Sequence, residues 1–304
     1  MKQSWQGVFP AVTTQMHRDQ SLDLDLTARH IEVLIDSGVS GLVMLGSLGE
    51  NVVLSRAEKL AVMRAAIEAA DGRVPVLSGV AECSTSGAIE YTRELEGVGT
   101  DGIMLLPAMV YKADARETLT HYKSVARATG LPIMCYNNPL AYSVDIKPEM
   151  FEQLAGVKNF VAIKESSGDV RRITDLINLL GNRYALFCGV DDLVLESAML
   201  GARGWIAGVG LAFPAENQAL WNLAAAGDWV KARALYRWFM PLLHLDIPVK
   251  FVQYIKLAVQ EAGFGREWVR APRLPLCGAE RARILAVIRE GLDTRPKMRT
   301  ARKR

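Results

Sequence analysis

Short apolar runs rich in β-branched residues alternate along this chain with longer stretches in which apolar residues recur three and four positions apart. The runs are typical of buried strands, and the longer stretches are typical of amphipathic helices. The predicted strands are residues 7–14, 41–46, 74–80, 102–107, 131–137, 160–166, 184–190 and 204–210. The predicted helices between them are residues 26–37, 56–70, 86–97, 116–129, 170–180 and 193–200.

Eight strand–helix units predict an α/β protein whose residues 1–227 form a closed (β/α)8 TIM barrel. The alternative is an open doubly wound sheet, which would place a G-x-G-x-x-G turn after its first strand. Here the first strand ends in Val12-Thr13-Thr14, and the later Gly208-Val209-Gly210 lacks the third glycine. We therefore favour the barrel.

More helical patterns follow than a barrel needs. They lie at residues 214–227, 228–244, 248–262 and 279–291. We therefore expect residues 228–294 to form a C-terminal helical appendage.

The composition fits a folded, water-soluble chain of one large domain or two smaller ones. Of the 304 residues, 50% are hydrophobic and 23% are charged. No apolar run has the length of a membrane span, and residues 1–7 lack the apolar core of a signal peptide. These features predict a cytoplasmic protein with no membrane partner.

The last ten residues carry the positive charge excess. Residues 295–304 contain six Lys or Arg and no Asp or Glu, so subtracting six from the net charge of +3 leaves −3 for the rest. Such a run predicts a disordered, solvated basic tail. Nucleic-acid binding is the alternative, but no zinc-finger spacing or other nucleic-acid motif accompanies the tail. We therefore predict no nucleic-acid partner.

Metal and thiol chemistry find little support in the sequence. The four cysteines form no C-x-x-C pair, and the four histidines show no H-E-x-x-H spacing. Cys135 and Cys188 fall in apolar runs, where buried free thiols are expected. The sequence therefore predicts neither a metal site nor a cofactor.

Lys164 is the residue with the clearest chemical meaning. It lies in the apolar run 160–167, where strand alternation places it on one face with Ala162 and Ser166. A buried ammonium is poorly solvated, so the pKa of Lys164 should fall and leave a neutral amine. Such an amine is the nucleophile that forms a Schiff base with a ketone or imine. The alternatives are a lysine that snorkels at a strand end or pairs with a carboxylate.

Other polar groups follow other strands, at the C-terminal ends where (β/α)8 enzymes place their active sites. The second strand leads into Gly46-Ser47-Leu48-Gly49-Glu50, whose backbone N–H groups and serine hydroxyl suit a carboxylate. The fifth strand ends near Tyr136, which can transfer a proton close to Lys164. Tyr111 follows the fourth strand and is either a second hydroxyl or a packing group.

Three motifs resemble those of the dihydrodipicolinate synthase and N-acetylneuraminate lyase family. Their order, their spacing and their positions on the predicted strands all match, and the resemblance covers nearly the whole chain. They are Gly46-Ser47-Leu48-Gly49-Glu50, Tyr136-Asn137-Asn138-Pro139 and Ile163-Lys164-Glu165. Members of this family are Schiff-base (β/α)8 lyases of class I, and their usual state is a homotetramer built as a dimer of dimers. The resemblance therefore implies a small-molecule carboxylate substrate and the same assembly.

The resemblance also implies a role for each matching residue. Lys164 would be the Schiff-base nucleophile and Tyr136 the proton shuttle. Tyr111 would be a relay hydroxyl that commonly reaches into a neighbouring subunit's site. Ser47 and the Leu48 N–H would bind the substrate carboxylate. Two further positions complete the predicted substrate-binding set, namely Gly46 and Ile206.

Two departures from the family pattern narrow the substrate. Leu48 stands where the family often has a hydroxyl residue, so the usual Tyr–Thr–Tyr relay is interrupted. Ala141 stands where dihydrodipicolinate synthases carry an arginine, two residues after Pro139. The second departure argues against the aldol condensation of lysine biosynthesis.

Several segments resemble one branch of the family, the Δ1-pyrroline-4-hydroxy-2-carboxylate deaminases of hydroxyproline breakdown. They are residues 7–14, the Gly-Ser-Leu-Gly-Glu turn, and residues 140–145, 162–167 and 236–239. The resemblance implies release of 2-oxoglutarate semialdehyde and ammonia from the cyclic imine and water, a lyase reaction that also hydrolyses a C–N bond. The alternative is a 2-keto-3-deoxy sugar acid aldolase or dehydratase, or another pyruvate-type aldolase.

Overall fold

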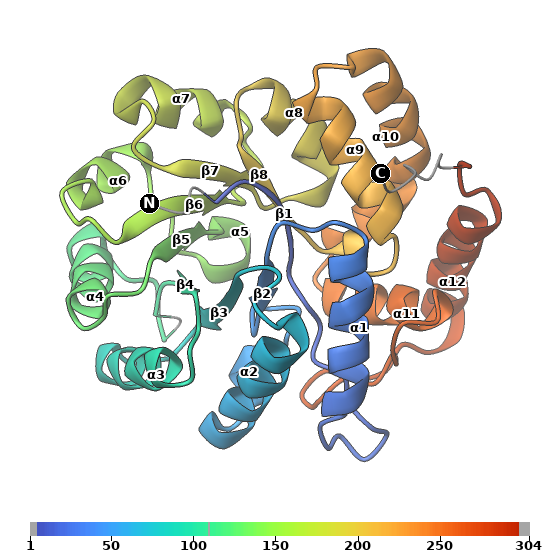
Figure 1. The fold of residues 1–304 in the computed structure, drawn as a ribbon, viewed down its shortest axis with the longest axis horizontal. Coiled ribbons are helices and arrows are strands. Elements are labelled where there is room, and N and C mark those ends of the chain that lie inside the picture. Colours follow the sequence, from blue (N-terminus) through green and yellow to red (C-terminus); the bar gives the residue numbers. More distant parts are fainter. Residues whose placement is uncertain (1–4, 109, 298–304) are drawn as a thin grey trace.

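The computed structural model describes residues 5–108 and 110–297. Eight parallel strands form one sheet in the order β1-β8-β7-β6-β5-β4-β3-β2. Its two edges meet where Ala11 bridges Val43 and the Val12 N–H donates to the Val43 carbonyl over 2.9 Å, so the sheet nearly closes (Figure 1). The strands are β1 (Gly7–Pro10), β2 (Leu42–Met44), β3 (Val76–Val80), β4 (Gly102–Leu105), β5 (Ile133–Asn137), β6 (Phe160–Glu165), β7 (Ala185–Cys188) and β8 (Gly204–Ala207).

Helices surround these strands and confirm the predicted (β/α)8 barrel (Figure 1). One helix follows each strand on the outside of the sheet. They are α1 (Leu24–Asp36), α2 (Arg56–Ala70), α3 (Thr85–Gly97), α4 (Ala115–Arg127), α6 (Pro148–Leu154), α7 (Arg171–Leu180), α8 (Val194–Met199) and α9 (Pro214–Ala225). A one-turn helix, α5 (Pro139–Tyr142), lies between β5 and α6.

Burial explains why the strands read as continuous apolar runs. Helices cover the outer face and the barrel interior covers the inner face, so both faces exclude water. All residues of the eight strands are buried except Val161, which is partly buried. Inside the barrel, Phe9 of β1 meets Phe187 of β7 edge to face, with ring centroids 5.4 Å apart. Such aromatic packing adds to the free energy gained by burial.

The structure differs from the sequence prediction at element ends. Several predicted strands extend too far, because residues such as Thr13 and Thr14 are buried after β1 has already ended. Helices α5 and α6 were not predicted, because four and seven residues are too few to show a helical period. Proline stands at the first position of both, where a helix tolerates it.

Three more helices follow the barrel and gather at one side of the molecule, near α1 and α9 (Figure 1). They are α10 (Trp229–Leu243), α11 (Phe251–Glu261) and α12 (Gly278–Asp293). Arg295, the first residue of the predicted basic tail, lies over the Phe213 ring and pairs with Glu216 at 3.1 Å. Residues 298–304 of that tail lie outside the described residues.

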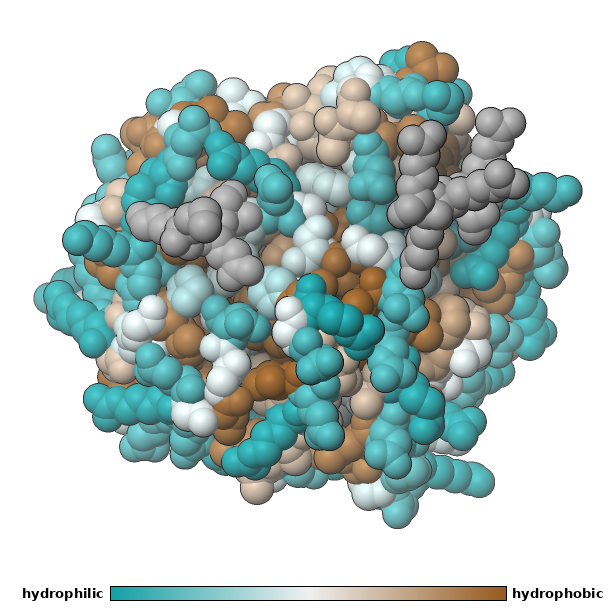
Figure 2. Space-filling model, viewed as in Figure 1, coloured by the Kyte–Doolittle hydropathy of each residue, from teal (hydrophilic) through white to brown (hydrophobic). Residues whose placement is uncertain are grey.

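Hydrophilic side chains occupy most of the rim in Figure 2, and apolar side chains show nearer the middle of this face. Within the described part of the chain, no helix is long and apolar enough to cross a membrane.

A buried ion pair ties α11 to the turn that follows β2. Lys256 and Glu50 are both fully buried, and the Lys256 ammonium donates to Glu50 Oε1 at 2.8 Å and to the Thr14 carbonyl at 2.9 Å. The other oxygen of Glu50 accepts from the Arg270 N–H at 3.0 Å. The C-terminal region therefore holds the turn that contains Ser47 and Leu48.

Removing one partner of this pair should destabilise the fold strongly. Lys256→Met leaves the Glu50 carboxylate buried without its nearest counter-charge, so the free energy of unfolding should fall by about 3–5 kcal/mol. Urea unfolding followed by circular dichroism measures the change. The double variant Glu50→Gln, Lys256→Met should recover part of the loss, because no charge is left buried and unpaired.

Lys231→Met is the matched control, since it breaks the exposed Lys231–Asp228 pair. Exposed pairs contribute about 0–1 kcal/mol, so this variant should unfold close to the wild type. A Lys256→Met variant as stable as the Lys231→Met variant would contradict the structural role of the buried pair.

Candidate active site

A cavity of about 590 Å³ opens at the C-terminal ends of the strands. This size falls in the range of small-molecule sites. Six of the seven predicted site residues line it together: Gly46, Ser47, Leu48, Tyr136, Lys164 and Ile206. The folding of the barrel therefore brings residues 160 positions apart in the chain into one wall.

Lys164 lies near the end of β6 and is 7% exposed. Its Nζ lies 4.0 Å from the centroid of the Tyr136 ring. Gly189 makes room for it, because a Cβ there would lie 2.7 Å from Lys164 Cε and 2.0 Å from Ser166 Oγ. Burial lowers the pKa of Lys164 below its ordinary value, and the negative charge of Asp246 opposes this shift. The direction agrees with the sequence prediction.

Two aspartates lie on the β7–β8 side of Lys164. Asp191 is fully buried and accepts from Trp205 Nε1 at 2.8 Å and from the Val209 N–H at 2.7 Å. Burial nevertheless raises the pKa of Asp191 to about 6, and the hydrogen bonds oppose the rise. Asp191 is thus held in place by these hydrogen bonds.

Asp246 lines the cavity from the one-turn helix His244–Asp246. Gly208 makes room for it, because a Cβ there would lie 2.6 Å from Asp246 Oδ1. No side chain of the described residues forms a hydrogen bond or ion pair with this carboxyl group. Burial raises the pKa of Asp246 well above its ordinary value, helped by Asp191 and opposed by Lys164. Asp246 is therefore a carboxyl group that can hold a proton beside the lysine.

Tyr136 and Ser47 lie on the opposite, β2–β5 side. The Tyr136 hydroxyl accepts a hydrogen bond from Asn138 Nδ2 at 3.0 Å, and burial raises the pKa of Tyr136 to about 12. Tyr142, the last residue of α5, packs edge-on against the Tyr136 ring with centroids 5.6 Å apart. Its hydroxyl is hydrogen-bonded to Ser47 Oγ. The hydroxyl-bearing side chains of Ser47 and Tyr136 line the cavity on this side, and Tyr142 supports Ser47 through its hydrogen bond.

Tyr111 is the predicted site residue that this chain does not bring into the cavity. Its side chain is 60% exposed, and its hydroxyl donates to Glu117 Oε1 at 2.8 Å. Glu117 also belongs to the capping box that begins α4. Within one chain, Tyr111 therefore points away from Lys164.

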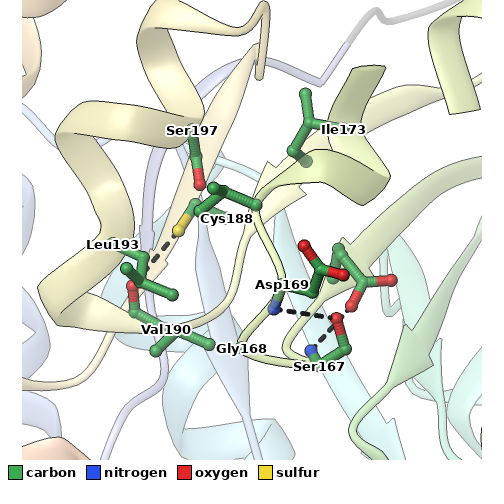
Figure 3. A pocket seen from close by; sticks show the side chains of 10 residues that line it. Ser167, Gly168, Asp169, Ile173, Cys188, Val190, Leu193 and Ser197 are labelled. Atoms are coloured by element: carbon green, nitrogen blue, oxygen red, sulfur yellow. Dashed lines mark hydrogen bonds between the residues drawn. The ribbon is translucent and has the colours of Figure 1, made fainter. Parts of the chain in front are cut away.

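A second, smaller cavity is lined by residues from the ends of β6 and β7 and from helices α7 and α8, and its side chains are drawn in Figure 3. Its volume is about 10 Å³, roughly the space of one water molecule. Cys188 lines it and donates to the Val190 carbonyl at 3.2 Å. Burial raises the pKa of this thiol to about 12, so it stays protonated. Cys188 and Cys135 are buried free thiols, as predicted.

Sequence reasoning missed Asp246 and Tyr142 as site residues. Asp246 lies between two predicted helices in a stretch without a motif, so no local signal marked it. Tyr142 lies three residues after Pro139, and its role depends on a contact with Ser47, 95 positions away. A polar residue soon after a strand end is the only signal that could have found it.

Comparison with known proteins agrees with this geometry. Residues 4–290 match the model of the dihydrodipicolinate synthetase family. The 4-hydroxy-tetrahydrodipicolinate synthase of Methanothrix thermoacetophila is 31% identical over 97% of this chain and 100% of its own length. That of Sorangium cellulosum is 36% identical over 93% of this chain and 95% of its own.

Solved structures show the same fold. The 4-hydroxy-tetrahydrodipicolinate synthase of Methylacidiphilum fumariolicum superposes with a TM-score of 0.91 at 28% identity, covering 95% of this chain and 96% of that one. A prophage protein of the family from E. coli, solved in complex with pyruvate, gives 0.88 at 29% identity, covering 95% and 99%. The chain therefore belongs to the dihydrodipicolinate synthetase family of class I lyases.

Proposed function

We propose that this enzyme is a Schiff-base deaminase that converts Δ1-pyrroline-4-hydroxy-2-carboxylate and water to 2-oxoglutarate semialdehyde and ammonia. One observation carries the proposal, namely the charges that line the cavity. Lys164 is the only lysine or arginine among the described lining residues, whereas Asp192 and Asp246 bring two carboxyl groups. Three of the relatives named above are called synthases, so the proposed substrate differs from the one their names state.

These charges favour a substrate with one carboxylate and a neutral or cationic far end. Asp192 already pairs with His244 at 2.9 Å, which leaves Asp246 as the carboxyl group available to a ligand. Ala141 lines the cavity where a synthase has an arginine, so a second substrate carboxylate would lack a counter-charge here. A cyclic hydroxy-imine with one carboxylate meets both conditions.

The first half of the reaction uses Lys164 and Tyr136. Ser47 Oγ and the Leu48 N–H hold the carboxylate, which places the imine carbon against Lys164. Neutral Lys164 attacks that carbon, and transimination opens the ring to leave a free amine on C5. The resulting iminium acidifies the C3 protons, and Tyr136, in its ionised form, removes one of them. The electron pair of that C–H bond forms an enamine.

The second half expels water and ammonia. The enamine expels the C4 hydroxyl, to which protonated Asp246 donates a proton, so that it leaves as water. Tautomerisation then moves the unsaturation to C5, where hydrolysis of the imine releases ammonia. Hydrolysis of the link to Lys164 frees 2-oxoglutarate semialdehyde. One water leaves and two enter, so the net reaction consumes one water. These steps require neither a metal nor an organic cofactor.

The proposal also includes the oligomeric state that is usual in the family. We propose a homotetramer in which Tyr111, exposed on its own chain, faces the site of a neighbouring subunit. The Ile206 side chain packs against the substrate on the β8 side of the cavity.

A 2-keto-3-deoxy sugar acid aldolase or dehydratase is the second candidate. One observation favours it, because a cavity of about 590 Å³ also has room for an open-chain hydroxy acid. The same lysine would serve, and cleavage would release pyruvate instead of ammonia.

Product analysis separates the two candidates. Purified enzyme given Δ1-pyrroline-4-hydroxy-2-carboxylate should release ammonia and 2-oxoglutarate semialdehyde in equal amounts, measured by coupled dehydrogenase assays. If neither product appears, and a 2-keto-3-deoxy sugar acid yields pyruvate or loses water, the second candidate replaces the first.

Lys164 should be the residue that becomes covalently labelled. Borohydride reduction with pyruvate at pH 7 should add one pyruvate-derived mass to the peptide containing Lys164. An ordinary lysine with a pKa of about 10.4 is neutral in only roughly one molecule in 2,500 at that pH. A lowered pKa makes the free amine more abundant, so labelling of Lys164 should persist at lower pH than labelling of exposed lysines. Lys164→Ala should abolish turnover and labelling, and a label on another lysine contradicts the mechanism.

Tyr136→Phe should slow turnover by about 10²–10⁴-fold, the usual effect of losing a general acid–base group. The adduct at Lys164 should still form, because attack on the carbonyl carbon does not use the phenol as its nucleophile. Tyr184→Phe is the control, since it removes a buried hydroxyl that donates to the Phe151 carbonyl outside the cavity. Steady-state assays with near-normal activity in Tyr136→Phe would exclude it as the proton shuttle.

A further inference from the structure

One buried hydroxyl of the cavity, that of Ser166, has no partner. Ser166 directly follows β6, is 3% exposed and lines the cavity. Its Oγ forms no hydrogen bond with the described residues. The alternation of side chains along a strand places it on the same face as Lys164. Because buried polar groups are normally hydrogen-bonded, this hydroxyl is a group that a ligand can satisfy.

Glycines after β7 and β8 leave the room that Ser166 and Asp246 occupy. A Cβ at Gly189 would lie 2.0 Å from Ser166 Oγ, and a Cβ at Gly208 would lie 2.6 Å from Asp246 Oδ1. Any larger residue at these two positions would therefore displace the polar groups. Since β7 and β8 are paired neighbours in the sheet, the free hydroxyl and the free carboxyl group lie on the same side of the cavity.

A carboxyl group and a hydroxyl group together suit a primary amine. An ammonium group has three N–H donors and no acceptor, so it pairs with a carboxylate and with a hydroxyl oxygen. A distal carboxylate of the ligand would instead meet Asp246, and among the described lining residues only Lys164 is a lysine or arginine. Asp192, the other acidic residue of the lining, is already paired with His244 at 2.9 Å. The Asp246 side therefore favours an amine over a carboxylate.

The order of groups across the cavity matches one class of ligand. Ser47 lies on the β2–β5 side, Lys164 lies at the end of β6, and Asp246 lies on the β7–β8 side. An ω-amino-2-oxo acid presents its groups in the same order, namely a carboxylate, a carbonyl carbon beside it and an amine at the far end. Five-carbon members of this class close into Δ1-pyrroline-2-carboxylates, because the amine condenses with the carbonyl carbon.

We propose that Asp246 and Ser166 form a subsite for a primary amine, and that this subsite selects five-carbon 2-oxo acids with an amine on C5. The inference rests on the function proposed above and deepens it, because ring opening of the cyclic imine frees an amine on C5. This amine is more basic than a carboxylate, so it takes the proton that Asp246 holds, and an ammonium–carboxylate pair forms. The same proton can return through Asp246 to the C4 hydroxyl as that group leaves.

The subsite also explains how the ring stays open during the reaction. A free amine on C5 would attack C2 again and close the five-membered ring. Binding to Asp246 and Ser166 keeps the amine protonated and away from C2 until the C4 hydroxyl has left. Unsubstituted Δ1-pyrroline-2-carboxylate lacks this hydroxyl, so it should form the open adduct with Lys164 and react no further.

Three ligands whose open forms differ only at C5 test the subsite separately from turnover. Δ1-pyrroline-2-carboxylate supplies an amine there, 2-oxopentanoate a methyl group and 2-oxoglutarate a carboxylate. Isothermal titration calorimetry should show that the first binds about 10-fold or more tightly than the second, because a hydrogen bond to a charged group distinguishes them. The third should bind most weakly. Borohydride reduction and mass spectrometry should place the open adduct, with its free amine, on Lys164.

Three variants assign the preference to the subsite. Asp246→Asn should lose the preference for the amine ligand and should bind 2-oxoglutarate more tightly than the wild type does. Ser166→Ala should weaken binding of the amine ligand more than binding of 2-oxopentanoate. Asp192→Asn is the matched control, because it removes a lining carboxylate that the subsite does not use, and it should keep the wild-type order. Pyruvate has no distal group, so its trapping at Lys164 shows that each variant retains a folded Schiff-base site.

Equal affinity of the wild type for Δ1-pyrroline-2-carboxylate and 2-oxopentanoate would overturn the subsite, and so would an unchanged preference in Asp246→Asn. Failure of the wild type to trap pyruvate at Lys164 would overturn the Schiff base and the subsite with it. A preference for the amine without ammonia release from the 4-hydroxy imine would support the subsite and reject only the deaminase assignment.

Discussion

The chemistry of this protein depends on one amine held out of water at the end of a strand. Lys164 is only 7% exposed, so water solvates its ammonium form poorly. Burial therefore lowers the pKa of Lys164 and favours the neutral amine. Negative charge at Asp246 and Asp191 pulls in the other direction. The balance between burial and these carboxyl groups sets how much free nucleophile the site contains. Tyr136, Gly189 and Ser166 pack closely around the Lys164 side chain. This packing excludes water from the amine and so favours its neutral form.

The barrel places chemically different groups on the two sides of Lys164. Because the strands are parallel and ordered around the barrel, groups after β7 and β8 lie on one side of Lys164 and groups after β2 and β5 on the other. The first side carries a carboxyl group that can be protonated, Asp246. The second side carries the hydroxyl groups of Ser47 and Tyr136, and Tyr142 is hydrogen-bonded to Ser47. A substrate with a carboxylate at one end and an amine or hydroxyl at the other fits this polarity.

Most of the fold could be predicted from the sequence, because buried parallel strands and amphipathic helices leave distinct periods. Lys164, Tyr136 and Ser47 could be found for the same reason, since each lies at the end of a predicted strand and barrels bring such ends together. Asp246 and Tyr142 could not, because their roles arise from packing between segments far apart in the chain. The short helices α5 and α6 could not be predicted, because four and seven residues are too few to show the repeat of apolar positions that indicates a helix.

The central claim is that the amine of Lys164 loses its proton more easily than an ordinary lysine does. Competitive labelling with a trace of acetic anhydride at a series of pH values, read by mass spectrometry of each lysine peptide, measures this property directly. The account predicts that the labelling of Lys164 titrates below the ordinary lysine pKa of about 10.4. It also predicts that substituting Asp246 with asparagine lowers the pKa of Lys164 further, because Asp246, once it has ionised, is the group that opposes this shift most. A Lys164 that titrates together with the exposed lysines would contradict the account.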